Sequence, residues 1–285
     1  MAERTPIFLA LGIVASVLLA LGLVMMKSRG KALAPAMGRG TGRAIRGWFR
    51  DPVWLGGLGV QLIGYALYLI ALSGSPVSLL AVMMQGGIAI FVAITVLFLH
   101  ERASGREWIG IGGVVAAMIL LSLSLRGGAA TSVTSSFALA ATSIGALGLA
   151  IAPYVNSRLR NSGLAAALAS GIVFGLGSLY AKAVTEIFVS NSADPVAMTL
   201  LTDPWLYLAI VANLSGLVLL QNSFHWARGI IAMPLSSACS NLVPIVGGIL
   251  AFGERIPAAA VPATMRIAAF ALTILAGGLL ATGRE

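Results

Sequence analysis

Four amide side chains lie deep within long apolar stretches of the sequence, namely Gln61, Gln85, Asn213 and Asn241. An amide carries hydrogen-bond donors and an acceptor, so it can bind the polar groups of a small molecule or join one helix to its neighbour. A polar group in apolar surroundings is costly unless it has a partner. Each of these positions is therefore a candidate for one of the two roles, and the residue types alone leave both open.

Two tyrosines accompany the first of these amides. Tyr65 and Tyr68 follow Gln61 by four and seven residues, a spacing that places all three side chains on one face of an α-helix. Their hydroxyl groups add hydrogen-bonding capacity to an apolar ring surface. We therefore predict a binding set made of Gln61, Tyr65, Tyr68 and the three other amides.

Ionisable side chains are scarce within the apolar stretches. Lys182 and Glu186 are four residues apart and can pair on one helix face. Such a pair is either structural, with both head groups reaching the membrane surface, or a gate linked to a proton or ion. His225 is a third candidate for gating or coupling because an unperturbed histidine titrates near neutral pH. A solvated histidine at the membrane surface is the alternative.

The sequence lacks the residues typical of magnesium binding, of catalysis and of a disulfide bond. Mg²⁺ is commonly held by one or two carboxylates with retained water, and no apolar stretch contains a pair of acidic residues at its centre. No acidic or histidine-rich cluster stands in a loop, so we expect neither an enzyme nor a resident cofactor, and we assign no metal ligands. The single cysteine, Cys239, permits no disulfide within the chain.

The composition indicates the elements that position these residues. Of 285 residues, 59% are hydrophobic and 9% are charged, whereas soluble domains carry about 25% charged residues. Long apolar stretches without alternation predict an all-α membrane protein that crosses the bilayer several times, because backbone groups in hydrocarbon must pair within their own segment. We predict nine spans, at residues 7–26, 53–72, 77–99, 108–125, 137–154, 164–188, 205–222, 230–252 and 266–281.

The basic residues predict the orientation. The loop at residues 27–50 contains seven Lys and Arg residues, and the other loops on the same side of nine spans are also basic. The positive-inside rule places this side in the cytoplasm, so we expect a cell-membrane protein with its N-terminus outside and its C-terminus in the cytoplasm. Orientation and lipid headgroups explain the net charge of +9 without a nucleic-acid partner. Residues 44–49, which include Trp48, are expected at the membrane surface.

The chain contains two similar parts. Residues 76–125 and 234–282 each hold two apolar stretches joined by a short charged turn, His-Glu-Arg at 100–102 and Gly-Glu-Arg at 253–255. Gln61 and Asn213 also stand at matching positions, after Asp-Pro pairs at 51–52 and 203–204. We therefore predict a first copy at 1–125 and a second at 164–285. A single linking helix at 137–155 inverts the second copy in the membrane. Glu101 and Glu254 are expected to cap helices or to pair with nearby arginines.

This paired pattern resembles the EamA-type transporters of the drug/metabolite transporter superfamily. The nine spans, the basic loop after the first span and the Pro-Val-Trp-Leu-Gly-Gly sequence at 52–57 are most similar to the nine-helix, NIPA-like branch. The resemblance implies secondary transport by alternating access, with a substrate site between the two inverted copies near the middle of the membrane. It covers nearly the whole chain.

The resemblance and the residues together give three functional hypotheses. The first is transport of a small polar or amphiphilic metabolite, with export favoured by the resemblance. The second is transport of magnesium or another divalent cation, which the NIPA-like branch implies and the missing carboxylates oppose. The third, from another class, is a lipid-binding membrane scaffold or an embedded enzyme, since the basic loop can attract phosphate headgroups. Membrane lipids are expected partners, and the sequence leaves monomer and homodimer open.

Overall fold

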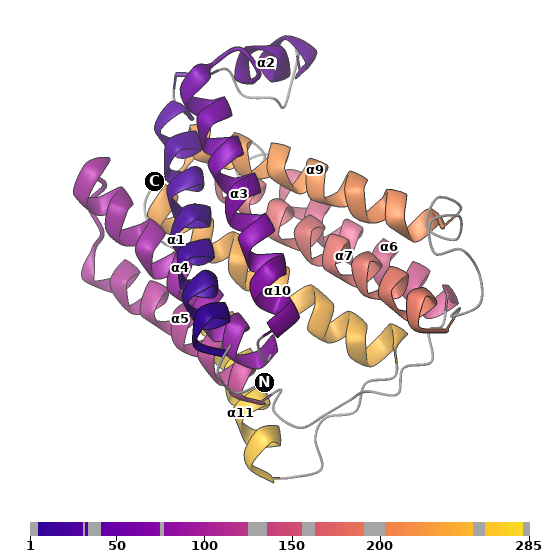
Figure 1. Cartoon of the computed structure of the whole chain (residues 1–285). Coiled ribbons are helices and arrows are strands. Elements are labelled where there is room, and N and C mark those ends of the chain that lie inside the picture. Colours follow the sequence, from indigo (N-terminus) through magenta and orange to yellow (C-terminus); the bar gives the residue numbers. More distant parts are fainter. Residues whose placement is uncertain are drawn as a thin grey trace. The chain divides into compact units, whose positions relative to one another are not determined.

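The structure is a computed structural model that describes residues 5–30, 32–33, 41–74, 77–124, 136–155, 163–190, 203–252 and 260–281. Every regular element in these ranges is a helix (Figure 1). The helices are α1 (Thr5–Arg29), α2 (Thr41–Trp48), α3 (Pro52–Gly74), α4 (Val77–Phe98), α5 (Gly105–Ser124), α6 (Ser136–Val155), α7 (Gly163–Ser190), α9 (Pro204–Trp226), α10 (Gly229–Ala251) and α11 (Ala260–Ala281).

The predicted apolar spans each fall on one of the long helices. Within the described residues, five helices contain a stretch long and apolar enough to cross a membrane: Ala10–Arg29, Ser136–Val155, Gly163–Val184, Pro204–Trp226 and Gly229–Ala251. The prediction of a multi-pass helical membrane protein is therefore confirmed. The number of nine spans stays a prediction.

Two helices begin with the same local arrangement, an aspartate followed by proline. The Asp51 carboxylate accepts the backbone N–H of Trp54 at 2.9 Å, and the Asp203 carboxylate accepts that of Trp205 at 2.9 Å. Aspartate satisfies N–H groups that have no partner inside the helix, and proline at the first helical position lacks the N–H that would otherwise be unpaired. The recurring Asp-Pro pairs are therefore helix starts.

Helix α5 begins with a reciprocal cap. The Ser104 N–H donates to the Glu107 carboxylate at 2.7 Å, and the Glu107 N–H donates to the Ser104 hydroxyl at 3.3 Å. This exchange satisfies two donors at the helix start, one by each side chain. It also fixes the Glu107 side chain, which is buried.

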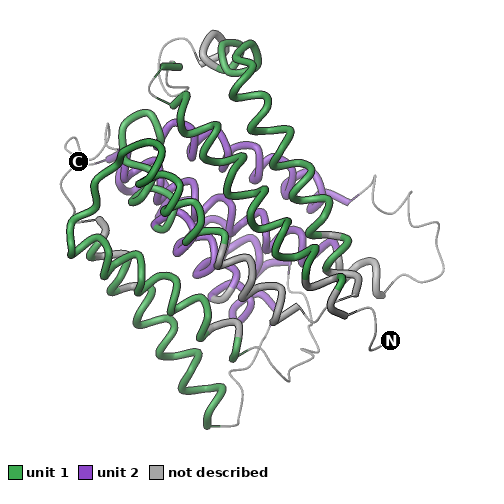
Figure 2. Tube along the Cα trace, turned by 60° about the vertical axis from the view of Figure 1, so that its left-hand side comes forward, with its two compact units in different colours: residues 1–128, 224–234, 257–285 green, residues 129–223, 235–256 purple. Residues whose placement is uncertain are grey.

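The described chain forms two compact units (Figure 2), of which the first contains residues 1–128, 224–234 and 257–285. In this unit α1 packs on α3 and α4, and α11 packs on α5. Helices α1 and α3 approach closely where glycines face each other. A Cβ atom on Gly22 would lie 2.6 Å from the Gly57 carbonyl oxygen, and one on Gly57 would lie 2.7 Å from the Gly22 oxygen. Close backbone approach at small residues is a usual way for helices to associate in membranes.

The second unit contains residues 129–223 and 235–256, so α9 and α10 have residues in both units. Its core includes large apolar side chains of α6 and α7, together with Phe252 directly after α10. At the contact of α7 with α9 and α10, the Ser170 hydroxyl donates to the Gly216 carbonyl at 3.0 Å and lies 3.2 Å from the Ser236 hydroxyl. The boundaries of these units differ from those of the two copies predicted from the sequence. The inverted repeat therefore stays a prediction.

The segment expected at the membrane surface forms the short helix α2 and the turn after it. Trp48 is buried and stacks on Trp54, with ring centroids 5.9 Å apart. Phe49 meets the Trp54 ring edge-on, at 5.4 Å, and its own side chain is exposed. Trp48 thus holds α2 to the start of α3, whereas Phe49 is exposed at the surface.

Candidate functional site

Four charged side chains of the first unit gather around the turn between α9 and α10. We call them the charged cluster, and they are Lys27, Glu101, Glu107 and Arg228. Lys27 ends the apolar part of α1, the two glutamates lie in and just after the α4–α5 turn, and Arg228 belongs to the α9–α10 turn. The cluster therefore joins three parts of the chain that are far apart in sequence.

Lys27 is the most deeply buried cation of the cluster, with 3% of its surface exposed. Its ammonium group lies 3.3 Å from the Glu101 carboxylate. It also donates to the backbone carbonyls of Phe224 at 3.0 Å and Ala227 at 2.8 Å. These carbonyls lie at the end of α9, where a positive charge is favourable because the helix dipole is negative there.

Glu101 caps the helix that follows the same turn. Its two carboxylate oxygens accept the backbone N–H groups of Gly229 and Ile230, both at 3.1 Å, at the start of α10. The preceding residue, His100, has a φ of 54°, which turns the chain sharply after α4. The predicted capping role is therefore confirmed. The cation beside Glu101 is Lys27, because the end of α1 approaches this turn. Glu254 lies outside the described residues.

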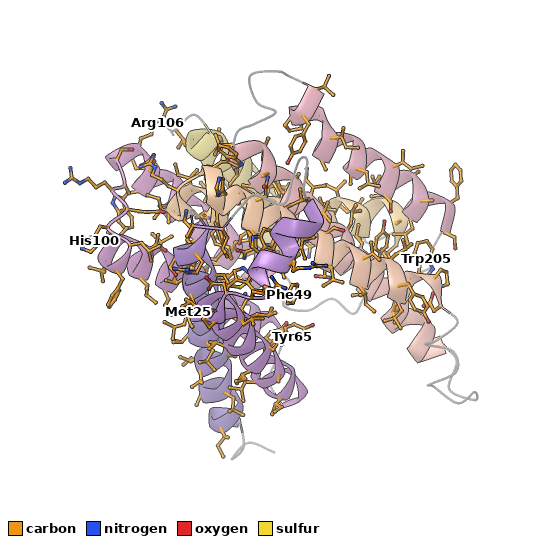
Figure 3. All side chains as sticks on the ribbon, turned by 90° about the horizontal axis from the view of Figure 1, so that it is seen from above. Met25, Phe49, Tyr65, His100, Arg106 and Trp205 are labelled. Atoms are coloured by element: carbon orange, nitrogen blue, oxygen red, sulfur yellow. The ribbon has the colours of Figure 1, made fainter. Side chains whose placement is uncertain are left out.

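The second ion pair of the cluster is formed by Arg228 and Glu107. One guanidinium nitrogen binds the Glu107 carboxylate, and another donates to the backbone carbonyl of Arg102. The Glu107 side chain is 3% exposed and that of Arg228 is 29% exposed, so the carboxylate is removed from solvent and the guanidinium is partly accessible. By contrast, His100 and Arg106 are exposed and project outward from the same region (Figure 3).

A further ion pair lies close by in the same unit. The Arg29 guanidinium contacts one oxygen of Asp51 at 2.7 and 2.8 Å. Hydrogen bonding from Arg29, followed by that from the Trp54 N–H, holds the pKa of Asp51 below its ordinary value of 3.8. Asp51 thus couples the end of α1 to the start of α3 in its charged form.

The lowered pKa predicts how acid affects stability. A carboxylate with a depressed pKa stabilises the folded state fully above its unfolded pKa, near 3.8, and the contribution is lost as pH falls towards the folded pKa. We expect Asp51→Asn to be less stable than the parent protein at neutral pH, with a difference that narrows below about pH 4. Thermal unfolding in detergent from neutral pH to pH 3 measures this. Arg29→Gln, which removes the partner of Asp51, is the control. A stability difference between Asp51→Asn and the parent protein that stays constant down to pH 3 would contradict the prediction.

The predicted binding residues fall into both units. In the first, Tyr65 and Tyr68 stack with ring centroids 6.0 Å apart, so they do share one face of α3. Gln61 lies against α1, because a Cβ atom on Gly22 would lie 2.6 Å from its Cγ atom. The side chain of Gln85 lies outside the described residues.

In the second unit, the predicted asparagines bond to their own helices. Asn213 donates to the Ala209 carbonyl at 2.8 Å, and Asn241 donates to the Ser237 carbonyl at 2.7 Å. Asn213 also lies against α7, where a Cβ atom on Gly177 would meet its amide nitrogen at 2.5 Å. These contacts favour the helix-joining role for Asn213. The predicted amides belong to different units, and their assembly into one site stays a prediction.

The candidates for gating lie in both units. Lys182 places its ammonium group 4.4 Å from the centroid of the Phe252 ring, a cation–π contact. The Glu186 side chain lies outside the described residues, so its pairing with Lys182 stays a prediction. His225 is half-buried, and its Nδ1 atom lies 2.8 Å from the Gly30 carbonyl oxygen, to which it donates. His225 therefore lies beside the α9–α10 turn, around which the charged cluster gathers.

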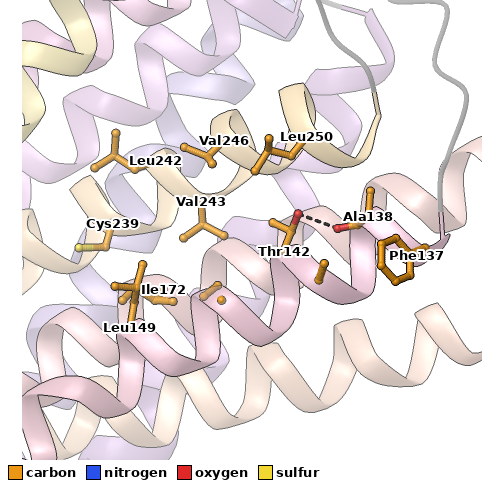
Figure 4. A pocket seen from close by; sticks show the side chains of 13 residues that line it. Phe137, Ala138, Thr142, Leu149, Ile172, Cys239, Leu242, Val243, Val246 and Leu250 are labelled. Carbon is orange, nitrogen blue, oxygen red and sulfur yellow. Dashed lines mark hydrogen bonds between the residues drawn. The ribbon is translucent and has the colours of Figure 1, made fainter.

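The second unit also contains an apolar groove of about 810 Å³ between α6, α7 and α10 (Figure 4). Its walls include Phe137, Ile172 and Leu250, together with the side chain of Cys239. The hydroxyl of Thr142, the other polar wall residue, donates to the Ala138 carbonyl at 2.7 Å. None of the predicted binding residues lines this groove.

Sequence reasoning did not identify the charged cluster or the groove. Lys27 was assigned to the basic loop, although its place directly after an apolar stretch was a signal for burial at a helix end. The sequence indicates the groove only weakly, through the small residues Ala141 and Gly145, which are one helical turn apart on α6. Small residues equally predict close helix contact, so this pattern alone was not decisive.

In the described part of the chain, no three His, Cys, Asp or Glu side chains are grouped so that they could hold a metal ion. Comparison with protein-family models, curated proteins and solved structures finds no match.

Proposed function

We propose that the protein is a secondary transporter that moves a small polar or amphiphilic metabolite across the cell membrane by alternating access. In this proposal the chain has nine spans in two inverted copies, as the EamA-like sequence pattern predicts. Its N-terminus lies outside and its C-terminus in the cytoplasm. The charged cluster is the structural observation that carries the proposal.

The contacts of Lys27 support the predicted number of spans. Segments that touch at a membrane surface lie on the same side, so an even number of crossings separates them. In the described residues, four helices lie between the α4–α5 turn and the α9–α10 turn, namely α5, α6, α7 and α9, and Lys27 contacts both turns. Three of the four helices have the length and composition of membrane spans. An even count then requires α5 to cross as well.

The cluster also has the properties of a gate. Alternating access needs contacts that close one end of the transporter and then separate. The Arg228–Glu107 pair joins the first predicted copy to the α9–α10 turn of the second. The bonds of Lys27 to the end of α9 and of Glu101 to the start of α10 make the same connection. A buried ion pair is costly to maintain without good partners, and here each carboxylate also binds backbone N–H groups. We therefore assign the cluster as the closed cytoplasmic gate.

The surroundings of the described residues favour an organic substrate over a divalent cation. Mg²⁺ requires oxygen ligands in a near-octahedral arrangement, and the described residues contain no acidic cluster of that kind. The apolar groove accommodates hydrocarbon, which supports an amphiphile and also supports the alternative of a lipid-binding scaffold.

Ligand-dependent stability followed by flux tests the proposal. Purified protein is heated with divalent cations, amino acids, organic cations and isoprenoid phosphates. A ligand at about 100 times its Kd stabilises the folded state by roughly 2.7 kcal/mol. We expect an organic compound to stabilise the protein and to enter proteoliposomes faster than empty liposomes.

The outcomes separate the hypotheses. A stabilising organic ligand with flux equal to that of empty liposomes would favour a binding scaffold over a transporter. Stabilisation and flux of a metal ion would favour the divalent-cation alternative. Gln61→Ala and Asn213→Ala test the site itself, because unchanged flux in both folded variants would remove these amides from the substrate site.

A further inference from the structure

The apolar groove of the second unit runs along two antiparallel helices. Phe137 at the start of α6 lies near Leu250 at the end of α10, and Leu149 lies near Cys239 at the other end of the groove (Figure 4). Both helices have the length and composition of membrane spans. The groove therefore extends from one end of these spans into the hydrocarbon layer.

The length of the groove matches one leaflet of a bilayer. From Phe137 to Leu149 is twelve residues of α6, which is about 18 Å at a rise of about 1.5 Å per residue. The hydrocarbon core of a bilayer is about 30 Å thick, so one leaflet contributes roughly 15 Å. A hydrocarbon chain that enters at the Phe137 end reaches the Cys239 end near the middle of the membrane.

The chemistry of the walls selects hydrocarbon. The thirteen described residues that line the groove include no charged side chain, and the Thr142 hydroxyl already has an acceptor within its own helix. A polar metabolite or hydrated cation would lose hydrogen bonds to water here without replacing them, at a cost of several kcal/mol. An alkyl chain loses nothing of this kind and gains contact with the walls.

A second copy of the chain fits the groove less well. A stable interface between proteins uses about 20–30 residues on each side. The groove offers thirteen, confined to part of α6 and α10 and one residue of α7. Its length corresponds to that of one leaflet's hydrocarbon.

We propose that this groove binds one acyl chain of a membrane phospholipid. In the predicted orientation, the start of α6 and the end of α10 face the outside, so the lipid comes from the outer leaflet. None of the amides assigned to substrate lines the groove, so the inference rests on the proposed orientation but not on transport.

Photolabelling tests the proposal on the full chain. The protein is reconstituted in liposomes that contain a phospholipid with a diazirine in the middle of one acyl chain, and the labelled residues are mapped by mass spectrometry after illumination. We expect label concentrated on groove residues of α6 and α10, above the level on exposed apolar positions elsewhere, such as Leu62 and Ile63 of α3.

Two glycines of α6 provide a matched pair of variants. Gly145 lines the groove, Gly148 does not, and a Cβ atom at either position would meet nothing within 4 Å. Gly145→Phe places a ring in the groove and should reduce groove labelling by at least about fivefold, because a filled cavity excludes a second occupant. Gly148→Phe makes the same chemical change outside the groove and should leave the labelling unchanged.

Two results would overturn the inference. One is equal labelling of groove and other exposed apolar residues in the parent protein, which indicates ordinary surrounding lipid and needs no variant to fold. The other is efficient cross-linking of two chains through Cys239 by a short bismaleimide in the same liposomes. Because Cys239 is the sole cysteine, that product would mean that a second copy occupies the groove.

Discussion

Lys27→Met is expected to lower the free energy of unfolding by about 3–5 kcal/mol, the usual cost of removing one partner from a buried ion pair. Methionine retains most of the length of the apolar stem but has no cation. The Glu101 carboxylate then keeps its two backbone N–H donors and loses the ammonium group at 3.3 Å. The carbonyls of Phe224 and Ala227 lose a donor at the same time.

The loss should be partly reversed by neutralising the carboxylate. The double variant Lys27→Met, Glu101→Gln leaves no uncompensated charge in the pair. It should therefore be more stable than the summed effects of Lys27→Met and Glu101→Gln on the free energy of unfolding predict. Arg106→Met is the control because Arg106 is a nearby exposed cation, and a surface substitution of this kind changes stability by about 0.5 kcal/mol or less. Chemical unfolding in detergent, followed by tryptophan fluorescence, measures Lys27→Met, Glu101→Gln, the double variant and Arg106→Met. Equal effects of Lys27→Met and Arg106→Met would contradict the role of the cluster.

Gly171→Ala is expected to destabilise the second unit by about 3 kcal/mol, at the upper end of the range for overpacking. A Cβ atom on Gly171 would overlap the backbone carbonyl oxygen of Ser236 and lie 2.7 Å from the Cys239 Cβ atom. A backbone group cannot move aside as a flexible side chain can. The hydrogen bond from Ser170 to the Gly216 carbonyl, beside the same contact, also resists a shift of α7.

Gly145→Ala separates this effect from the general preference of helices for alanine. Both glycines lie within helices, but a Cβ atom on Gly145 meets nothing within 4 Å. Alanine there should stabilise the protein slightly, by up to about 1 kcal/mol. The melting temperatures of the two variants in one detergent give the comparison. If Gly171→Ala melts with or above the parent protein, the close contact of α7 with α10 is not as described.

The sequence predicted the helices well because their cause is local. A long stretch without charge cannot leave backbone groups unpaired in hydrocarbon, so it becomes helical whatever its neighbours are. The start of α3 at Pro52 and that of α9 at Pro204 were likewise visible in the recurring Asp-Pro pairs, since a helix cap depends on residues a few positions apart.

The partners of the polar residues were harder to predict. Asn213 and Asn241 bond to carbonyls four residues earlier, although their depth in apolar stretches fitted a binding site equally well. Lys27 looked like one basic residue among several in a loop. Its partners Phe224 and Ala227 are about 200 residues away in sequence, and no spacing rule connects them.

By itself, the sequence determined that this is a helical, multi-pass membrane protein, where its helices lie and which few polar residues stand within them. Only the tertiary structure decided that Lys27 and Glu101 hold the α9–α10 turn, and that α6, α7 and α10 leave an apolar groove. The physical reason is the range of the interactions. Hydrophobicity and capping act within a segment and can be read from it, whereas ion pairing and packing depend on which segments the fold brings together.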